Sequence, residues 1–272
     1  LYHHSSNNDV SSSSNSSLPR LYLPKIQHYE EAVFLADVLE NCRKELGYKE
    51  GDIRTTVLIE TLQAIFQTDE IAYALRDTIS GLNCGRWDYL YGIMKVQNQG
   101  SLEGTLPDRY LLTMDQPFME AYVKQIVSTA NIRGIYPMGG MSALIPSKDS
   151  DANLHILEKI KADKQLEISR GCMGAWVAHP GLIEPVKQVF LNNHVSKIKG
   201  DSVVMLPREV TGLTDFGNSS SSKKHQYDTL RDNVKISLQY IAGWLSGNGA
   251  VAIDGLMEDL ATSEISVFQI KQ

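Results

Sequence analysis

The sequence predicts an α/β fold in which alternating strands and helices form a parallel β/α barrel, followed by a helical C-terminal part. Short apolar runs alternate with amphipathic segments through residue 192, and this repetition indicates a parallel sheet covered by helices. Polar residues of the types used in catalysis recur at the ends of successive predicted strands, which favours a barrel. A doubly wound sheet is the alternative, but no GxGxxG turn follows a predicted strand.

Two strand–helix units are predicted near the start of the chain. Residues 20–26 are predicted to form a strand, and residues 30–46 carry apolar side chains at helical spacing. Residues 53–59 are rich in β-branched side chains and almost continuously apolar, which is typical of a strand buried on both faces. A helix is predicted over 62–79.

The alternation continues through the middle of the chain. A third strand is predicted over 87–96, and it leads through a Gly/Pro-containing loop to a helix over 117–130. Two further strand–helix pairs follow, at 134–137 with 152–168 and at 175–178 with 182–192. Beyond Lys224 the pattern is helical only, with helices predicted over 227–245 and 253–265.

Two polar stretches divide the chain into regions. Residues 1–18 are mostly Ser, Asn and His, a composition that buries little apolar surface and predicts a flexible tail or loop. A serine-rich stretch predicts a linker or surface loop over 213–226. The barrel portion is therefore assigned to 19–212 and the helical C-terminal domain to 227–272.

Composition excludes several classes of protein. The net charge of -6 and the pI near 5.7 argue against a nucleic-acid partner. Cys42, Cys84 and Cys172 form no CxxC pair, so neither a zinc knuckle nor a disulfide framework is indicated, and a reducing compartment is expected. No apolar run approaches the roughly 20 residues that span a bilayer, so no membrane partner is expected. The chain lacks an initiator Met and a Ser-Lys-Leu ending, and we expect it to be a fragment.

Two carboxylates at strand ends are candidate metal ligands. Glu60 directly follows the apolar run 53–59, and Asp88 follows the glycine-containing segment 81–85. Neighbouring carboxylates suit Mg²⁺, which takes one or two protein carboxylates and completes its octahedron with water and substrate. The alternative is structural: Glu60 pairs with Arg54 or Arg86, and Asp88 caps a loop.

Other candidates each have a structural alternative. The glycines of 81–85 could offer backbone N–H groups to an anion, or simply form a turn. Asp259 could act as a general base or cap a helix. His179 could be an acid–base group or a hydrogen-bonded structural residue. Residues 137–141 could form a loop over a cofactor arm, or a plain connection.

Seven sequence blocks, in order, resemble the malate synthase family, and the resemblance covers the chain almost from Leu21 to Ile265. The blocks are Leu21-Tyr22-Leu23-Pro24-Lys25, Arg54-Thr55-Thr56-Val57-Leu58-Ile59-Glu60-Thr61, Gly81 through Tyr89, Gly139-Gly140-Met141, Ala162-Asp163-Lys164, Trp176-Val177-Ala178-His179-Pro180 and Leu256-Met257-Glu258-Asp259. The resemblance implies a TIM-type (β/α)8 barrel, incomplete at its N-terminal side, followed by a helical C-terminal domain that contributes the catalytic base.

The resemblance also implies a reaction, the Mg²⁺-dependent condensation of acetyl-CoA with glyoxylate and hydrolysis of malyl-CoA to malate and CoA. This makes the chain an acyltransferase of the glyoxylate cycle, in a peroxisome or glyoxysome or in the cytoplasm, and allows a homo-oligomer. The implied residues are Glu60 and Asp88 for Mg²⁺, Gly85, Arg86 and Trp87 for glyoxylate, Asp259 as the base, and Pro180 and Met257 for acetyl-CoA.

The chain departs from the family pattern at three places. A family arginine that stabilises the developing enolate lies upstream of the residues present here. Cys172-Met173 replaces a His-Asp pair, and Gln27 replaces a glutamate. Loss of such a charge stabiliser lowers the rate, so a catalytically impaired relative that binds CoA or a partner is the alternative. A barrel lyase or aldolase acting on another oxoacid is a third hypothesis.

Overall fold

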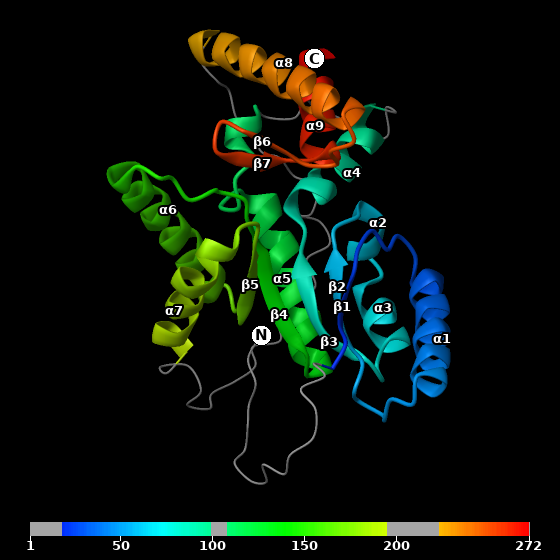
Figure 1. Cartoon of the computed structure of the whole chain (residues 1–272). Helices are drawn as coiled ribbons and strands as arrows, with labels where there is room; N and C mark the ends of the chain where they lie inside the picture. Colours follow the sequence, from blue (N-terminus) through cyan, green and yellow to red (C-terminus); the bar gives the residue numbers. More distant parts are fainter. Residues whose placement is uncertain (1–17, 99–107, 195–222, 272) are drawn as a thin grey trace.

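A parallel sheet of five strands forms the centre of the protein (Figure 1). The computed structural model describes residues 18–98, 108–194 and 223–271. The strands follow one another across the sheet in sequence order, and each pairs in parallel with the next. They are β1 (Arg20–Leu23), β2 (Arg54–Ile59), β3 (Ile79–Cys84), β4 (Tyr136–Ser142) and β5 (Gly174–Val177).

Helices connect the strands and cover the outside of the sheet (Figure 1). They are α1 (Tyr29–Glu45), α2 (Leu62–Ile65), α3 (Thr68–Ala74), α4 (Arg86–Asn98), α5 (Pro117–Arg133), α6 (Ser150–Ser169) and α7 (Ile183–His194), with 3-10 turns η1 (Arg109–Leu111) and η2 (Pro180–Leu182). Helix α5 begins with Pro117 and is capped at its C-terminus by Gly134, whose φ of 66° suits glycine. The predicted parallel β/α fold is confirmed.

The sheet is strongly curved, as in part of a barrel. Tyr22 lies on β1 and Trp176 on β5, the two edges of the sheet, yet their rings stack with centroids 5.0 Å apart. The Tyr22 hydroxyl also donates to the Met138 sulfur at 3.6 Å. Side chains from opposite edges can meet only if the strands bend around a shared interior, which is the geometry of a barrel.

The main core lies between the sheet and helices α2 to α5. Strand β2 is buried from its second residue onward, as its continuous apolar run predicts. Helix α5 contributes Phe118, Tyr122 and Ile126, all fully buried against this sheet face. Burying such side chains stabilises the fold by roughly 1.5–3 kcal/mol each, so this packing holds the strands, and the residues at their ends, in place.

The C-terminal unit lies beyond the carboxyl ends of the strands (Figure 1). It consists of α8 (Lys223–Leu245), a hairpin of β6 (Val251–Ile253) and β7 (Leu256–Glu258), and α9 (Leu260–Lys271). The predicted helix over 253–265 is therefore wrong for residues 253–258, which form the hairpin, and right from Leu260 onward. The Asp254-Gly255 turn explains the hairpin, because both residues have positive φ, as a two-residue hairpin turn requires.

Two predictions in the first half of the chain are also wrong. Residues 87–96 form most of helix α4 rather than a strand, and the predicted helix 62–79 divides into α2 and α3 before β3 begins. Strand β3 contains Gly81 and Asn83, which normally disfavour strands. Here Gly81 permits close contact with the Tyr136 carbonyl, and Asn83 donates to the Gly139 carbonyl at 2.8 Å.

No helix in the described part of the chain is long and apolar enough to cross a membrane. The predicted tail at 1–18 lies almost wholly outside the described residues, and the predicted linker 213–226 lies mostly outside them.

Candidate functional site

The ends of three neighbouring strands supply a lysine and two carboxylates. Lys25 follows β1, Glu60 follows β2, and Asp88 lies in the first turn of α4, just after β3. Because these strands are parallel and adjacent, their carboxyl ends lie at one edge of the sheet, below the C-terminal unit (Figure 1). This is the edge at which barrel enzymes carry their active sites.

Lys25 links the two carboxylates. Its backbone N–H donates to Glu60 Oε1 at 2.8 Å, and its ammonium forms an ion pair with Asp88. Lys25 has a φ of 60°, an uncommon conformation for a residue with a side chain. The predicted alternative partners of Glu60, Arg54 and Arg86, are not the ones observed. Sequence reasoning missed Lys25 as a site residue, although it belongs to the Leu-Pro-Lys block.

Burial and charge perturb both Glu60 and Lys25. Burial, together with the nearby Asp88 carboxyl, raises the pKa of Glu60 to about 7, although Lys25 opposes the shift. Burial alone would lower the pKa of Lys25, but hydrogen bonding to Asp88 and the charge of Glu60 raise it. The charge of Asp259 also raises the pKa of Lys25, which indicates that Asp259 lies within electrostatic reach of this edge.

Two carboxylates that repel one another in this way would be stabilised by a cation between them. Among the residues described, no three His, Cys, Asp or Glu side chains lie close enough together to hold a metal ion alone. Glu60 and Asp88 fit Mg²⁺ even so, because this ion commonly keeps water and substrate as its remaining ligands.

Gly85 permits the close packing of Glu60 against α4. A Cβ atom at position 85 would overlap the Cβ of Glu60, so only glycine fits there. The Gly85 N–H donates to the Tyr122 hydroxyl at 2.8 Å, and this hydroxyl donates to the Ile59 carbonyl. The Gly85 amide is thus committed to Tyr122 rather than to an anion. Residues 81–84 belong to β3 and Gly85 joins this strand to α4, so the predicted tight turn is wrong.

A Tyr122→Phe variant is expected to be less stable by roughly 1–3 kcal/mol, because the Gly85 N–H and the Ile59 carbonyl both lose a partner in a buried place. Urea unfolding followed by circular dichroism measures the change. Tyr240→Phe is the matched control, since among the described residues the Tyr240 hydroxyl makes one long hydrogen bond, 3.4 Å, to the Gly249 carbonyl. Equal losses in both variants would contradict the importance of the Tyr122 hydroxyl.

Two guanidinium groups lie over the ring of Trp87. Arg86 lies 4.3 Å and Arg109 5.0 Å from the centre of the indole ring. Burial lowers the pKa of Arg86, and the carboxylate of Asp163 opposes this shift. The predicted residues Gly85, Arg86 and Trp87 thus lie together at the start of α4. The first helical bond there joins the Tyr89 N–H to the Gly85 carbonyl at 3.2 Å.

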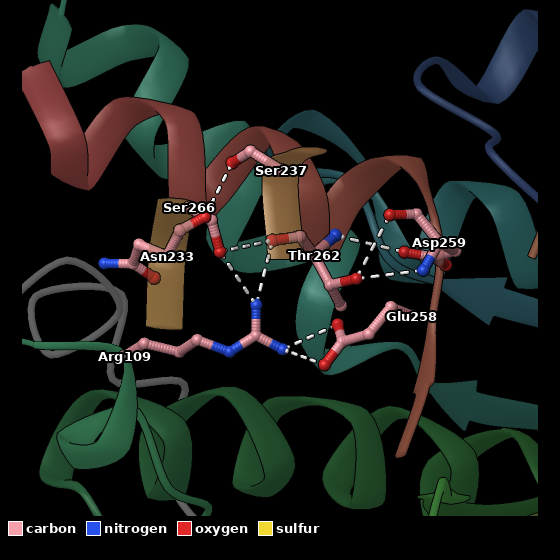
Figure 2. Close-up of polar contacts among 7 residues, drawn as sticks. All are labelled: Arg109, Asn233, Ser237, Glu258, Asp259, Thr262 and Ser266. Atoms are coloured by element: carbon pink, nitrogen blue, oxygen red, sulfur yellow. Dashed lines mark hydrogen bonds and ion pairs between the residues drawn. The ribbon is translucent and has the colours of Figure 1, made fainter. Parts of the chain in front are cut away.

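Asp259 caps the N-terminus of α9 (Figure 2). Its Oδ1 accepts from the Thr262 N–H at 3.0 Å, and its own N–H donates to Thr262 Oγ1 at 2.9 Å. This reciprocal pair is a capping box, so the structural alternative for Asp259 is confirmed. The cap engages one carboxylate oxygen of a partly exposed side chain, so capping and a role as base are compatible.

The other predicted residues lie apart from the carboxylates. Met257 belongs to β7, and its N–H donates to the Ala143 carbonyl at 3.2 Å. Pro180 is exposed at the start of η2, where the neighbouring His179 accepts from the Gly181 N–H at 3.0 Å. His179 is therefore a structural cap. No described hydrogen bond or ion pair joins Pro180 or Met257 to Glu60 or Asp88.

Residues 137–141 belong to β4 rather than to a loop, which corrects the predicted loop over a cofactor arm. Behind them lies a buried ion pair that sequence reasoning missed. Lys164 is 0% exposed, and its ammonium donates to Glu167 Oε1 and to the Gly140 carbonyl, both at 2.8 Å. Burial raises the pKa of Glu167 to about 7, and Lys164 opposes the shift. This pair ties α6 to β4, because both side chains bond the backbone of Gly140.

Comparison with known proteins gives the family. The model of the malate synthase TIM-barrel domain matches residues 1–210, and that of the malate synthase C-terminal domain matches residues 224–272. The chain belongs to the malate synthase family. Among curated malate synthases, malate synthase A of Escherichia coli K12 is 43% identical over 254 residues, which is 93% of this chain and 47% of the relative. Glyoxysomal malate synthase of Gossypium hirsutum is 41% identical over 269 residues, covering 93% and 45%.

The chain thus spans about half the length of the curated malate synthases it matches. The malate synthase of Haloferax volcanii, solved as a pyruvate/acetyl-CoA ternary complex, superposes with a TM-score of 0.58 at 16% identity, over 92% of this chain and 61% of that one. At this identity the likeness supports the fold alone. Of the departures from the malate synthase pattern, Cys172 is buried in the core and Gln27 is exposed.

Proposed function

We propose that this chain carries malate synthase chemistry, the condensation of acetyl-CoA with glyoxylate followed by hydrolysis of malyl-CoA to malate and CoA. The observation that carries the proposal is the meeting of Glu60 and Asp88 at one edge of the sheet, where Lys25 contacts both, with α9, the helix that Asp259 caps, packed against α4. Membership of the malate synthase family supports the same reaction.

Glu60 and Asp88 would hold Mg²⁺, which polarises the glyoxylate aldehyde as a Lewis acid when bound. Arg86 and Trp87, at the start of α4, would orient the glyoxylate carboxylate, because helix N-termini and arginine both favour anions. Gly85, whose amide is bound to Tyr122, would contribute by letting Glu60 pack closely against this helix. Glu60 would contribute as the carboxylate, the form that a neighbouring cation favours over the protonated one.

Asp259 would be the general base. Its carboxylate would take a proton from the acetyl methyl group, and the electron pair left on that carbon would form the new bond to the aldehyde carbon. The aldehyde oxygen would take up a proton and become the hydroxyl of malate, and Asp259 would pass its proton to water. Water would then cleave the C–S bond of the thioester, which gives the second carboxylate of malate and the thiol of CoA. Pro180 and Met257 would contact acetyl-CoA.

The test is malate formation from acetyl-CoA and glyoxylate with Mg²⁺. We expect product in the presence of Mg²⁺, loss of product when EDTA removes the metal, and recovery when excess Mg²⁺ is returned, because Glu60 and Asp88 alone cannot polarise the aldehyde. Circular dichroism before and after EDTA shows that the chain stays folded. Product formation that is insensitive to EDTA would contradict the metal assignment.

The same assay separates the alternatives. A folded chain that binds acetyl-CoA but forms no malate would be a catalytically impaired relative, and turnover with other oxoacids in place of glyoxylate would indicate a different barrel lyase. The relatives from Gossypium hirsutum and Candida tropicalis are both named as glyoxysomal malate synthases. We propose that this chain is located in the peroxisome or glyoxysome, or in the cytoplasm. Homo-oligomer formation stays a prediction.

A further inference from the structure

Arg109 is a buried cation with an unusually full set of partners (Figure 2). The residue is 8% exposed, and Nη2 donates to both carboxylate oxygens of Glu258 at 2.6 Å. Its Nη1 donates to the Thr262 carbonyl at 3.0 Å and to the Ser266 hydroxyl at 3.1 Å. A single guanidinium therefore holds the end of β7 and the first two turns of α9.

These contacts lie on both sides of Asp259. Glu258 precedes Asp259 in the chain, and Thr262 is the partner of the Asp259 capping box. The backbone of Asp259 is thus fixed at each end by groups that Arg109 binds. A planar guanidinium that binds in two directions restricts orientation as well as position, which a lysine cannot do.

Arg109 also contacts the part of the site that carries Glu60 and Asp88. Its guanidinium lies over the ring of Trp87, 5.0 Å from the centroid, and Trp87 is the residue before Asp88. Arg109 therefore contacts the neighbours of both Asp88 and Asp259. Glu258 itself is 1% exposed, so its charge is buried and depends on Arg109.

We infer that Arg109 and Glu258 are a positioning pair that sets the location of Asp259 relative to Asp88 and Glu60. The pair touches no substrate in this role; it acts by holding the C-terminal unit to the first turn of α4. The inference rests on the proposed function for its effect on turnover, but its effect on the order of α9 stands independently.

The test compares Glu258→Gln and Arg109→Lys with the wild-type chain. Glutamine keeps the shape of Glu258 but loses its charge. Lysine keeps the charge of Arg109 but lacks the planar guanidinium that binds both carboxylate oxygens. Asp254→Asn is the matched control, because Asp254 lies in the same hairpin and forms an exposed ion pair with Lys235 at 2.6 Å. Asn also tolerates the positive φ of that turn.

Two measurements are made on each variant: amide hydrogen exchange over 256–271, and kcat and KM normalised to the folded fraction. For Glu258→Gln we expect faster exchange confined to this segment and a kcat lowered roughly 10–100-fold, with KM for glyoxylate unchanged, because the base is displaced while the metal side is intact. For Arg109→Lys we expect an exchange rate and a kcat between those of wild type and Glu258→Gln. For Asp254→Asn we expect the exchange rate and kcat of wild type.

Unchanged exchange over 256–271 in Glu258→Gln would overturn the inference. So would faster exchange spread over the whole barrel with kcat per folded molecule unchanged, since the pair would then serve stability alone. If the wild-type chain makes no malate, the proposed function fails, but segment-specific exchange still decides whether the pair orders Asp259.

Discussion

Replacing Asp259 with asparagine is expected to lower the rate of malate formation by a factor on the order of 10²–10⁴, the usual contribution of a positioned general base. An amide cannot take the proton of the acetyl methyl group. Asparagine keeps an oxygen that accepts from the Thr262 N–H, and it is as good a helix cap as aspartate, so α9 should form normally. The measurement is the rate with saturating acetyl-CoA, glyoxylate and Mg²⁺.

The chain offers a close control for this substitution. Asp149 caps α6, where its Oδ1 accepts from the Ala152 N–H at 2.8 Å, and no described hydrogen bond or ion pair joins it to Glu60 or Asp88. Asp149→Asn makes the same chemical change in the same structural role, and it should leave the rate unaltered. A wild-type rate in Asp259→Asn, with Asp149→Asn also active, would show that another group takes the proton.

Replacing Lys164 with methionine is expected to destabilise the protein by about 3–5 kcal/mol, the typical result of removing one partner from a buried ion pair. The remaining Glu167 carboxylate is 3% exposed, so it would be left without its cation. The Gly140 carbonyl would also lose the donor that it now has at 2.8 Å. Chemical denaturation measures the free energy of unfolding.

A double variant separates charge from packing. Lys164→Met combined with Glu167→Gln removes both charges, and the Gln oxygen can still accept from the Gly140 N–H, which now binds Glu167 at 2.9 Å. We expect it to recover most of the stability lost in the single variant, because uncharged partners carry a smaller desolvation cost. A double variant as unstable as Lys164→Met would assign the loss to packing instead.

Much of the fold followed from local patterns. The continuous apolar run at β2 predicted a buried central strand, and the apolar spacing of α1, α5 and α6 predicted those helices within a few residues. Strand β3 and helix α4 were misread, because Gly81 and Asn83 disfavour a strand on their own. Their conformation depends on Tyr136 and Gly139 across the sheet, which lie more than 50 residues away in the chain.

Part of the candidate site likewise followed from local sequence patterns, and part depended on the tertiary structure. The sequence by itself determined that Glu60 follows a buried strand and that Asp259 begins a helix, because a carboxylate after an apolar run or before a helix is a local signal. It did not place Asp88 correctly, since this residue lies in the first turn of α4, where a strand was predicted. Only the tertiary structure decided that Lys25 joins the two carboxylates and that Arg109 holds Glu258 beside Asp259. Those partners lie 63 and 149 residues apart in the chain. Their pairing depends on how strand ends and the C-terminal unit meet in space, and no local pattern records that.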